Sequence, residues 1–339
     1  MAILEVDDLR KEYGGFTAVD GSSFAIERGE VFGVVGPNGA GKTTTLKMLA
    51  GLIEPTAGTA VVAGHTPGDP EMARQLGFLP EESPLYEEMT ATDYLEFFAD
   101  LYDVPRSVAR DRIDRTLERL DLEHRDRRLG NMSKGMKRKV AIARALVNDP
   151  DVLIFDEPAS GLDPLTTNYI IEFTQELSDE GKTIVFSAHN LFHVESVCDR
   201  IIIMNDGRIV ARGTIDAIRE VHGGTEYHVY ATVDAGNGAL TDDNDDEFRH
   251  VVADMDAVES IREVVEREGG RITDIQTETP TLEDIFLEVA SESRENSESR
   301  ENSESRENNE GRNGSERDGR DGDESSRSDS NEDAAEART

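Results

Sequence analysis

Along residues 1–222, two hydrophobic patterns take turns: short runs of mostly apolar residues, and longer stretches in which apolar residues recur at intervals. Short, mainly apolar, strand-like runs, such as Val31–Val35, Val152–Phe155 and Thr183–Ser187, are typical of strands that are buried on both faces of a parallel sheet. The stretches between them carry apolar residues every three or four positions, which is the spacing of one helix face. This alternation predicts an α/β domain over residues 1–222.

The segment of about residues 84–130 inside this domain departs from the alternation. Thr90 and Asp93 form a capping-box pattern ahead of an aromatic-rich stretch, which indicates the start of a helix. Apolar residues then recur at helical spacing, at Ile113, Leu117 and Leu120. We therefore expect a helical insert.

Residues 225–290 carry strand-like and helical patterns of their own and predict a small second α+β domain. The expected elements are a strand in 225–233, a strand in 247–255, a helix over Ala257–Glu268, a strand in 271–279 and a final helix that Thr281 and Asp284 cap. This order predicts a split β-α-β, ferredoxin-like unit.

From Ser291 the sequence repeats SESREN three times and then contains almost no apolar residues. Such a segment cannot bury enough surface to offset the entropy of ordering. We expect a disordered, acidic, low-complexity tail over 291–339. Replication slippage without function explains the repeat at least as well as a binding role.

Length and composition limit the class of protein. A chain of 339 residues fits about two domains. It has no uncharged apolar run long enough to span a bilayer, and its N-terminus does not resemble a signal peptide, so we expect a cytoplasmic location. The single cysteine, Cys198, fits a reducing compartment and is best interpreted as a small buried apolar residue.

The net charge of −36 is extreme and is not confined to the tail. The region 291–339 has 16 acidic and 8 basic residues, so most of the excess belongs to the part that is expected to fold. A chain this acidic repels itself at low salt, and high salt screens the repulsion. We therefore expect a halophilic source, such as a halophilic archaeon. No basic stripe is apparent, which argues against nucleic acid as a partner.

The strongest chemical signal is GPNGAGKT, which follows the strand run VFGVV and precedes a helical pattern. This is a P-loop in the strand–loop–helix context that it requires. Glycines let backbone N–H groups face phosphate oxygens, Lys42 is expected to reach the β- and γ-phosphates, and the Thr43 hydroxyl is expected to bind Mg²⁺. The expected nucleotide-binding residues are Gly36, Pro37, Asn38, Gly39, Ala40, Gly41, Lys42, Thr43 and Thr44.

A second pattern, VLIFDEP, narrows the class from any P-loop protein to one that hydrolyses its nucleotide. The buried strand Val152–Phe155 delivers Asp156 to its carboxyl end, where we expect it to hold Mg²⁺. Glu157 follows directly and is placed to activate water as a general base.

The run NMSKGMKRKVAIARAL resembles the signature sequence of ABC ATPases, with Ser133 and Gly135 at the serine and second glycine of LSGGQ. Lys134 and Met136 depart from that pattern. SGLDP resembles the D-loop and includes Asp163, His189 resembles the switch histidine that contacts the γ-phosphate, and Tyr13 stands where the family has an aromatic residue that stacks on adenine. Glu81 stands where the family usually has glutamine, and it either binds Mg²⁺ or serves only its loop.

This resemblance implies an ATP-hydrolysing subunit of an ABC transporter with a P-loop α/β core. It implies ATP and Mg²⁺ as cofactors and a head-to-tail pair with a second cassette, for which another copy of this chain is the expected partner. It also implies a separate integral membrane permease, which would hold the subunit at the inner face of the cell membrane. The segment PTLEDIFLEVA resembles one that follows the cassette in subunits for drug, antibiotic, sodium or polysaccharide export, so export is favoured over import.

Four weaker interpretations stay open. An ABC ATPase that acts on ribosomes or DNA is the main alternative, although the chain has one P-loop and no long coiled coil. A regulator that binds ATP without turnover is a second. His189, His193 and Glu195 could share a helix face as metal ligands. The acidic run TDDNDDEF resembles half of a calcium loop, but a solvated hairpin loop is favoured.

Overall fold

A computed structural model of the chain describes residues 2–222, 224–236, 240–241, 248–278 and 280–287. The expected tail over 291–339 and the acidic run at 242–247 lie outside these residues, so the disorder and calcium-loop interpretations are not addressed. The α/β core and the small α+β unit are both present.

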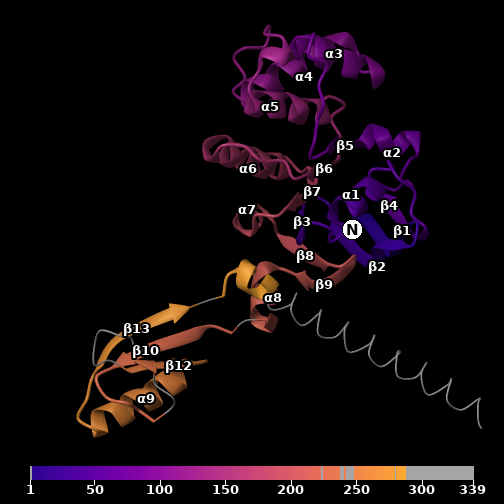
Figure 1. Ribbon diagram of the computed structural model, residues 1–339. Coiled ribbons are helices and arrows are strands. Elements are labelled where there is room, and N and C mark those ends of the chain that lie inside the picture. Colours follow the sequence, from indigo (N-terminus) through magenta and orange to yellow (C-terminus); the bar gives the residue numbers. More distant parts are fainter. Residues whose placement is uncertain (1, 223, 237–239, 242–247, 279, 288–339) are drawn as a thin grey trace, which may run out of the picture. The chain divides into compact units, whose positions relative to one another are not determined.

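A six-stranded sheet forms the centre of the cassette (Figure 1). In spatial order its strands are β5 (Leu76–Leu79), β6 (Val152–Asp156), β7 (Thr183–Ala188), β3 (Val31–Val35), β8 (Arg200–Asn205) and β9 (Arg208–Gly213). All pair in parallel except β9, which runs antiparallel to β8. Every residue of β3, β6 and β7 is buried, because layers cover both faces of a parallel sheet.

A second sheet, which the sequence patterns did not predict, covers one face of the central sheet. Its strands are β1 (Ala2–Tyr13), β2 (Phe16–Glu27) and β4 (Ala57–Val62), paired antiparallel with β1 in the middle. With the P-loop helix α1 (Lys42–Leu49) it buries one apolar cluster, which includes Leu4, Ile26, Leu46 and Val34. A short helix, α2 (Pro70–Gln75), leads into β5.

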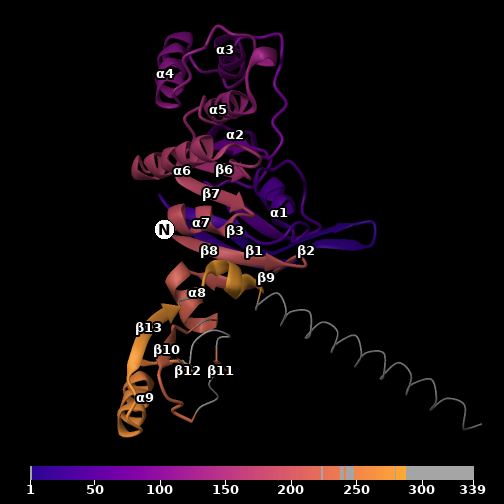
Figure 2. The ribbon, with the colours of Figure 1, turned by 60° about the vertical axis from the view of Figure 1, so that its left-hand side comes forward.

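Helices cover the other face and include the expected insert. They are α3 (Ala91–Leu101), α4 (Arg106–Arg119), the 3-10 turn Leu129–Asn131, α5 (Lys134–Ala145), α6 (Pro164–Asp179) and α7 (Leu191–Val197). Figure 2 shows α3, α4 and α5 grouped together. The predicted cap of α3 is confirmed, because Thr90 Oγ1 accepts a hydrogen bond of 3.1 Å from the backbone N–H of Asp93.

After α8 (Ile215–His222), a four-stranded antiparallel sheet contains the predicted split β-α-β unit. Its elements are β10 (Glu226–Ala231), β11 (Leu240–Thr241), β12 (Phe248–Val252), α9 (Met255–Arg267) and β13 (Ile272–Glu278). Because β10 pairs antiparallel with both β12 and β13, the strands that flank α9 run parallel with β10 between them.

The final predicted helix is present over residues 282–287, and the Thr281–Asp284 capping box forms. The sequence pattern assigns this helix to the small domain over 225–290. Its buried side chains, Leu282 and Ile285, pack instead in the apolar cluster of the cassette. The backbone N–H of Leu282 also donates to Glu195 Oε1 on α7, at 3.1 Å.

Candidate active site

The P-loop connects β3 to α1 in a backbone path that requires glycine. Gly36 has φ +151°, and a Cβ there would lie 2.2 Å from the carbonyl oxygen of Met204. Gly41 has φ +99°, and its Cβ would lie 2.5 Å from the carbonyl oxygen of Ala18. Gly41 is also the N-cap of α1 and supplies no side-chain acceptor, so the first N–H groups of the helix are available to an anion.

Lys42 lies at the centre of the site. Its Nζ donates to the carbonyl oxygens of Gly36 (2.7 Å) and Pro37 (3.2 Å) and lies 3.8 Å from Glu157 Oε1. Burial lowers the pKa of Lys42, while the nearby carboxylates, Glu157 foremost, oppose that shift. The ammonium is therefore held inside the loop, next to the acid at the end of β6.

Asp156 has the environment of a metal-binding carboxylate. Its Oδ1 accepts hydrogen bonds from the hydroxyls of Ser187 (2.8 Å) and Thr43 (3.3 Å), whereas its Oδ2 is buried and has no hydrogen-bond partner. Burial raises the pKa of Asp156. A buried oxygen without a partner beside a threonine hydroxyl fits Mg²⁺, which binds proteins through one or two oxygen ligands and keeps the rest for water and phosphate.

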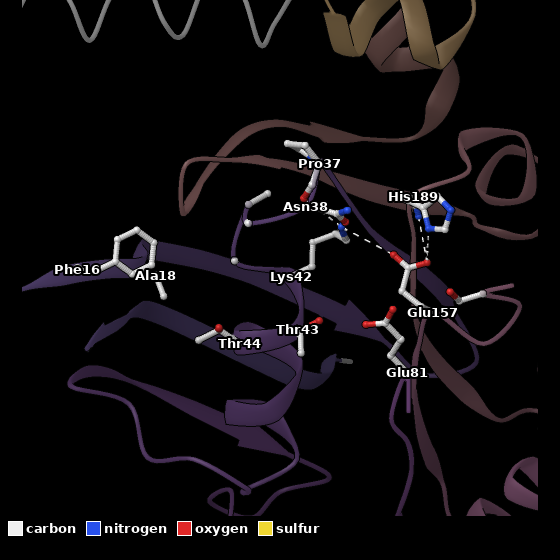
Figure 3. Close-up of a pocket in the computed structure, with 14 residues that line it drawn as sticks. Phe16, Ala18, Pro37, Asn38, Lys42, Thr43, Thr44, Glu81, Glu157 and His189 are labelled. Atoms are coloured by element: carbon white, nitrogen blue, oxygen red, sulfur yellow. Dashed lines mark hydrogen bonds and ion pairs between the residues drawn. The ribbon is translucent and has the colours of Figure 1, made fainter. Parts of the chain in front are cut away.

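Glu157 adopts an uncommon backbone conformation at the end of β6. Its φ is +49°, in the left-handed region that non-glycine residues rarely enter. Its Oε2 lies 2.8 Å from His189 Nδ1 and accepts from the His189 backbone N–H at 3.3 Å. Figure 3 shows Glu157 between Lys42 and His189, with dashed lines to both.

These residues open onto a cavity of about 380 Å³. Eleven of the sequence-predicted site residues line it: Pro37, Asn38, Gly39, Ala40, Gly41, Lys42, Thr43, Thr44, Glu81, Glu157 and His189. Gly36 and Asp156 do not line it but hydrogen-bond to Lys42 and Thr43 respectively. Glu81 faces the cavity from the loop after β5 (Figure 3).

Four predicted site residues are not among those that line this cavity. Tyr13 is not among its lining residues, where the aromatic side chain is that of Phe16. Ser133 is the N-cap of α5 and accepts from the Met136 N–H at 3.2 Å. Asp163 caps α6 and bonds Thr166, and a Cβ at Gly135 would lie 3.2 Å from the Thr166 side chain. Ser133, Gly135 and Asp163 are thus near one another and outside their own chain's cavity.

Three residues near the site escaped the sequence analysis. Ser187 could have been noticed as a hydroxyl inside the apolar run of β7, and Phe16 as an aromatic residue beside the Gly14–Gly15 turn. Arg138 gave no usable signal, because it stands in the run KRK, which is typical of an exposed surface. Arg138 is nevertheless buried.

A family model described as ABC transporter matches residues 19–160. A second, described as the C-terminal domain of ATP-binding proteins like DrrA1-3, matches residues 213–290.

Several curated relatives are similar over the cassette. The ABC transporter ATP-binding protein NatA of Bacillus subtilis (strain 168) is 44% identical over 207 residues, which cover 60% of this chain and 84% of that protein. Nod factor export ATP-binding protein I of Ralstonia nicotianae is 42% identical over 62% of this chain and 67% of its own length. The linearmycin resistance ATP-binding protein LnrL of Bacillus subtilis is 38% identical over 62% of this chain and 69% of its own length.

Two solved structures show the same cassette fold. An ATP-binding subunit of an ABC transporter is 37% identical, covers 65% of this chain and 93% of its own, and has a TM-score of 0.61. A dimeric cassette in a post-hydrolysis state, bound to ADP and phosphate, is 26% identical over 62% of this chain and 98% of its own, with a TM-score of 0.58.

Proposed function

The chain belongs to the family of ABC transporter ATP-binding proteins, and on that premise we propose that it is the ATP-hydrolysing subunit of an exporter whose permease is a separate membrane protein. The observation that carries the proposal is the position of Glu157, with one carboxylate oxygen 3.8 Å from Lys42 Nζ and the other 2.8 Å from His189 Nδ1. The P-loop cation, a carboxylate and the switch histidine thus meet at one cavity.

The geometry supports a division of roles in hydrolysis. The P-loop N–H groups, the N-terminus of α1 and Lys42 hold the phosphates. Thr43 and Asp156 would hold Mg²⁺, which would neutralise phosphate charge. Glu157 takes the proton of a water molecule whose oxygen attacks the γ-phosphorus, and the bond to the β–γ bridging oxygen breaks as ADP leaves. His189 orients the Glu157 carboxylate through the 2.8 Å contact.

In a pair of cassettes, Ser133, Gly135 and Asp163 of one chain would contact the nucleotide that the other chain binds. These residues do not line the cavity of their own chain, and Ser133 lies at the N-terminus of α5, which suits an anion. In a head-to-tail pair they would cover the nucleotide of the partner. The ADP- and phosphate-bound relative is a dimer, which supports the pairing of two cassettes.

Export and a membrane partner rest on the relatives. Nod factor export protein I and the linearmycin resistance protein point to outward transport, and the match over residues 213–290 covers the segment downstream of the cassette. No helix among the described residues is long and apolar enough to cross a bilayer. On the family relationship, a separate permease would supply the path and would hold this subunit at the inner face of the membrane. The net charge of −36 further supports work at molar salt, as in a halophilic archaeon.

The test uses Glu157→Gln in the full chain. With ATP, Mg²⁺ and molar KCl, the variant should bind ATP but release phosphate about 10²–10⁴-fold more slowly than the wild type if Glu157 is the general base. Exposed Glu172 on α6 offers a matched control, and Glu172→Gln should hydrolyse normally. Near-normal turnover by Glu157→Gln would refute its role.

The same variant tests the transporter assignment. Tagged Glu157→Gln protein is pulled down with ATP from detergent-solubilised membranes, and bound proteins are identified by mass spectrometry. A co-purifying multi-span membrane protein is the expected result. Recovery with ribosomal or DNA-bound proteins alone would leave the ATPase chemistry in place and overturn the transport role.

A further inference from the structure

The side chain of Arg138 joins three parts of the cassette. It lies on α5, the helix that Ser133 caps, and is buried. Its guanidinium donates to five backbone carbonyl oxygens, those of Pro80 (2.7 Å), Glu81 (3.0 Å), Asp156 (3.1 Å), Glu157 (2.8 Å) and Pro158 (2.7 Å). All three of its nitrogens are therefore engaged.

These carbonyls belong to the ends of two neighbouring strands. Pro80 and Glu81 follow β5, whereas Asp156 closes β6 and Glu157 follows it, and β5 and β6 pair in parallel. The planar guanidinium has five N–H donors in a fixed fork, so one side chain can hold both strand ends in a set spacing. Lysine would keep the charge but could not reach both ends with directed hydrogen bonds.

The contact with Glu157 explains how its left-handed backbone persists. Glu157 has φ +49°, a conformation that lasts only where surrounding groups hold it. Its N–H donates to Ser187 at both the carbonyl oxygen (3.2 Å) and the hydroxyl (3.0 Å). Its carbonyl oxygen accepts from Arg138. The peptide groups on both sides of the residue are thus fixed, and so is the direction in which its carboxylate leaves the backbone.

The charge of Arg138 is sustained in this buried position. Burial lowers its pKa to about 10, while Asp156, Glu81 and Glu157 oppose that shift. The guanidinium therefore remains protonated at neutral pH. A buried cation is tolerated when every donor has an acceptor and carboxylates lie near, and both conditions are met here.

We propose that Arg138 is a positioning residue that ties the signature helix α5 to the loops of Glu81 and Glu157 and holds the Glu157 carboxylate in the geometry for hydrolysis. The inference rests on the proposed ATPase role of Glu157. It predicts that the arginine affects the chemical step and not ATP binding, because Arg138 is not among the residues that line the nucleotide cavity.

The test compares Arg138→Lys with Arg144→Lys in the full chain. Arg144 lies on the same helix, and its guanidinium donates to Tyr94 Oη on α3 at 3.0 Å. Arg138→Lys should lower kcat for phosphate release about 10- to 100-fold, the effect expected from a misplacement of about 1 Å, with an unchanged KM for ATP. Arg144→Lys should leave both values unchanged. Arg138→Lys should also lower the melting temperature, because it leaves buried carbonyl oxygens without donors, so kcat is measured well below the melting temperature of each variant.

A double-variant comparison separates positioning from general stability. In a Glu157→Gln background, followed by single-turnover phosphate release, Arg138→Lys should lower the rate no further, because the group it positions is already absent. Equal losses in both backgrounds or an unchanged kcat would each overturn the inference. Absence of hydrolysis by the wild-type chain would instead refute the proposed function.

Discussion

At the scale of single residues, the nucleotide cavity is short of positive charge. Lys42 is the only lysine or arginine among its 14 lining residues, and Glu81 and Glu157 line it as well. A nucleotide triphosphate must therefore be held largely by backbone N–H groups and the N-terminus of α1, which do not depend on net charge. The partnerless Oδ2 of Asp156 indicates where Mg²⁺ would offset the remaining repulsion.

The base of the nucleotide is expected to stack on Phe16. Phe16 lines the cavity and Tyr13 does not. Stacking of a base on an aromatic ring contributes about 1–3 kcal/mol, so Phe16→Ala should raise the Kd for ATP by roughly 5- to 150-fold. Tyr13→Ala is the matched control and should have a smaller effect. Titration with a fluorescent ATP analogue measures both, and a larger loss in Tyr13→Ala would restore the expectation from family resemblance.

Glu30 should make stability depend on pH. It is 8% exposed, and burial raises its pKa, opposed by hydrogen bonding to the Glu27 backbone and by Arg200. An acid whose pKa is raised on folding stabilises the fold below its unfolded pKa of about 4.3, and that contribution is lost as pH rises through the folded pKa.

Glu30→Gln should therefore raise the melting temperature at pH 7, and the gain should vanish near pH 4. Glu54→Gln removes the same charge from an exposed site and controls for the change in net charge. Equal gains from the two variants at pH 7, or a gain that persists at pH 4, would show that Glu30 is not destabilised by burial.

At the scale of elements, the helix over residues 282–287 ties the C-terminal region to the cassette. Leu282 and Ile285 are fully buried in the cassette's apolar cluster. Glu195 on α7 accepts hydrogen bonds from the Leu282 N–H and from Arg219 of α8. Because α7 begins two residues after His189, this helix supports the segment that carries His189.

Truncation of Ile285, a buried side chain of the helix over residues 282–287, should destabilise the cassette itself. Ile285→Ala is expected to lower the free energy of unfolding by about 2–5 kcal/mol, the usual loss for a buried isoleucine. Leu287, on the same helix, is 61% exposed, and Leu287→Ala should change little. Urea unfolding in molar KCl, monitored by circular dichroism, measures both. Equal, small effects would show that the helix does not contribute to the cassette core.

At the scale of the whole molecule, acidic surface dominates. The chain has 72 acidic and 36 basic residues, and many arginines are already paired with carboxylates, as in Arg119 with Glu176 and Glu180. The excess carboxylates repel one another through solvent, and the range of that repulsion shrinks to about 3 Å at 1 M salt. Salt should therefore stabilise the fold as a whole.

The melting temperature should rise between 0.1 M and 1 M KCl. Any further rise to 3 M would reflect stronger burial of apolar surface and not screening, which is nearly complete by then. Parallel curves in NaCl separate screening from an effect of K⁺ itself. A melting temperature that is constant from 0.1 M to 3 M KCl would contradict the prediction that this protein is halophilic.

Local sequence was enough to predict much of this chain, because the relevant physics acts over a few residues. Buried parallel strands appear as continuous apolar runs, helix starts as capping pairs such as Thr90 with Asp93, and the P-loop as glycines before a lysine. These patterns predicted the α/β core, the helical insert and most of the residues around the cavity. The family resemblance added His189 and Glu81.

Tertiary structure decided what depends on residues far apart in the chain. The antiparallel sheet of β1, β2 and β4, the docking of Ile285 and the place of Phe16 in the cavity wall all follow from packing between segments that are far apart in the chain. Arg138 shows this most clearly. It stands in the run KRK, a pattern that is typical of solvent-exposed surface, and yet the Arg138 guanidinium hydrogen-bonds to the ends of two strands. Burial and hydrogen-bond partners belong to the assembled fold, so no local pattern could have shown them.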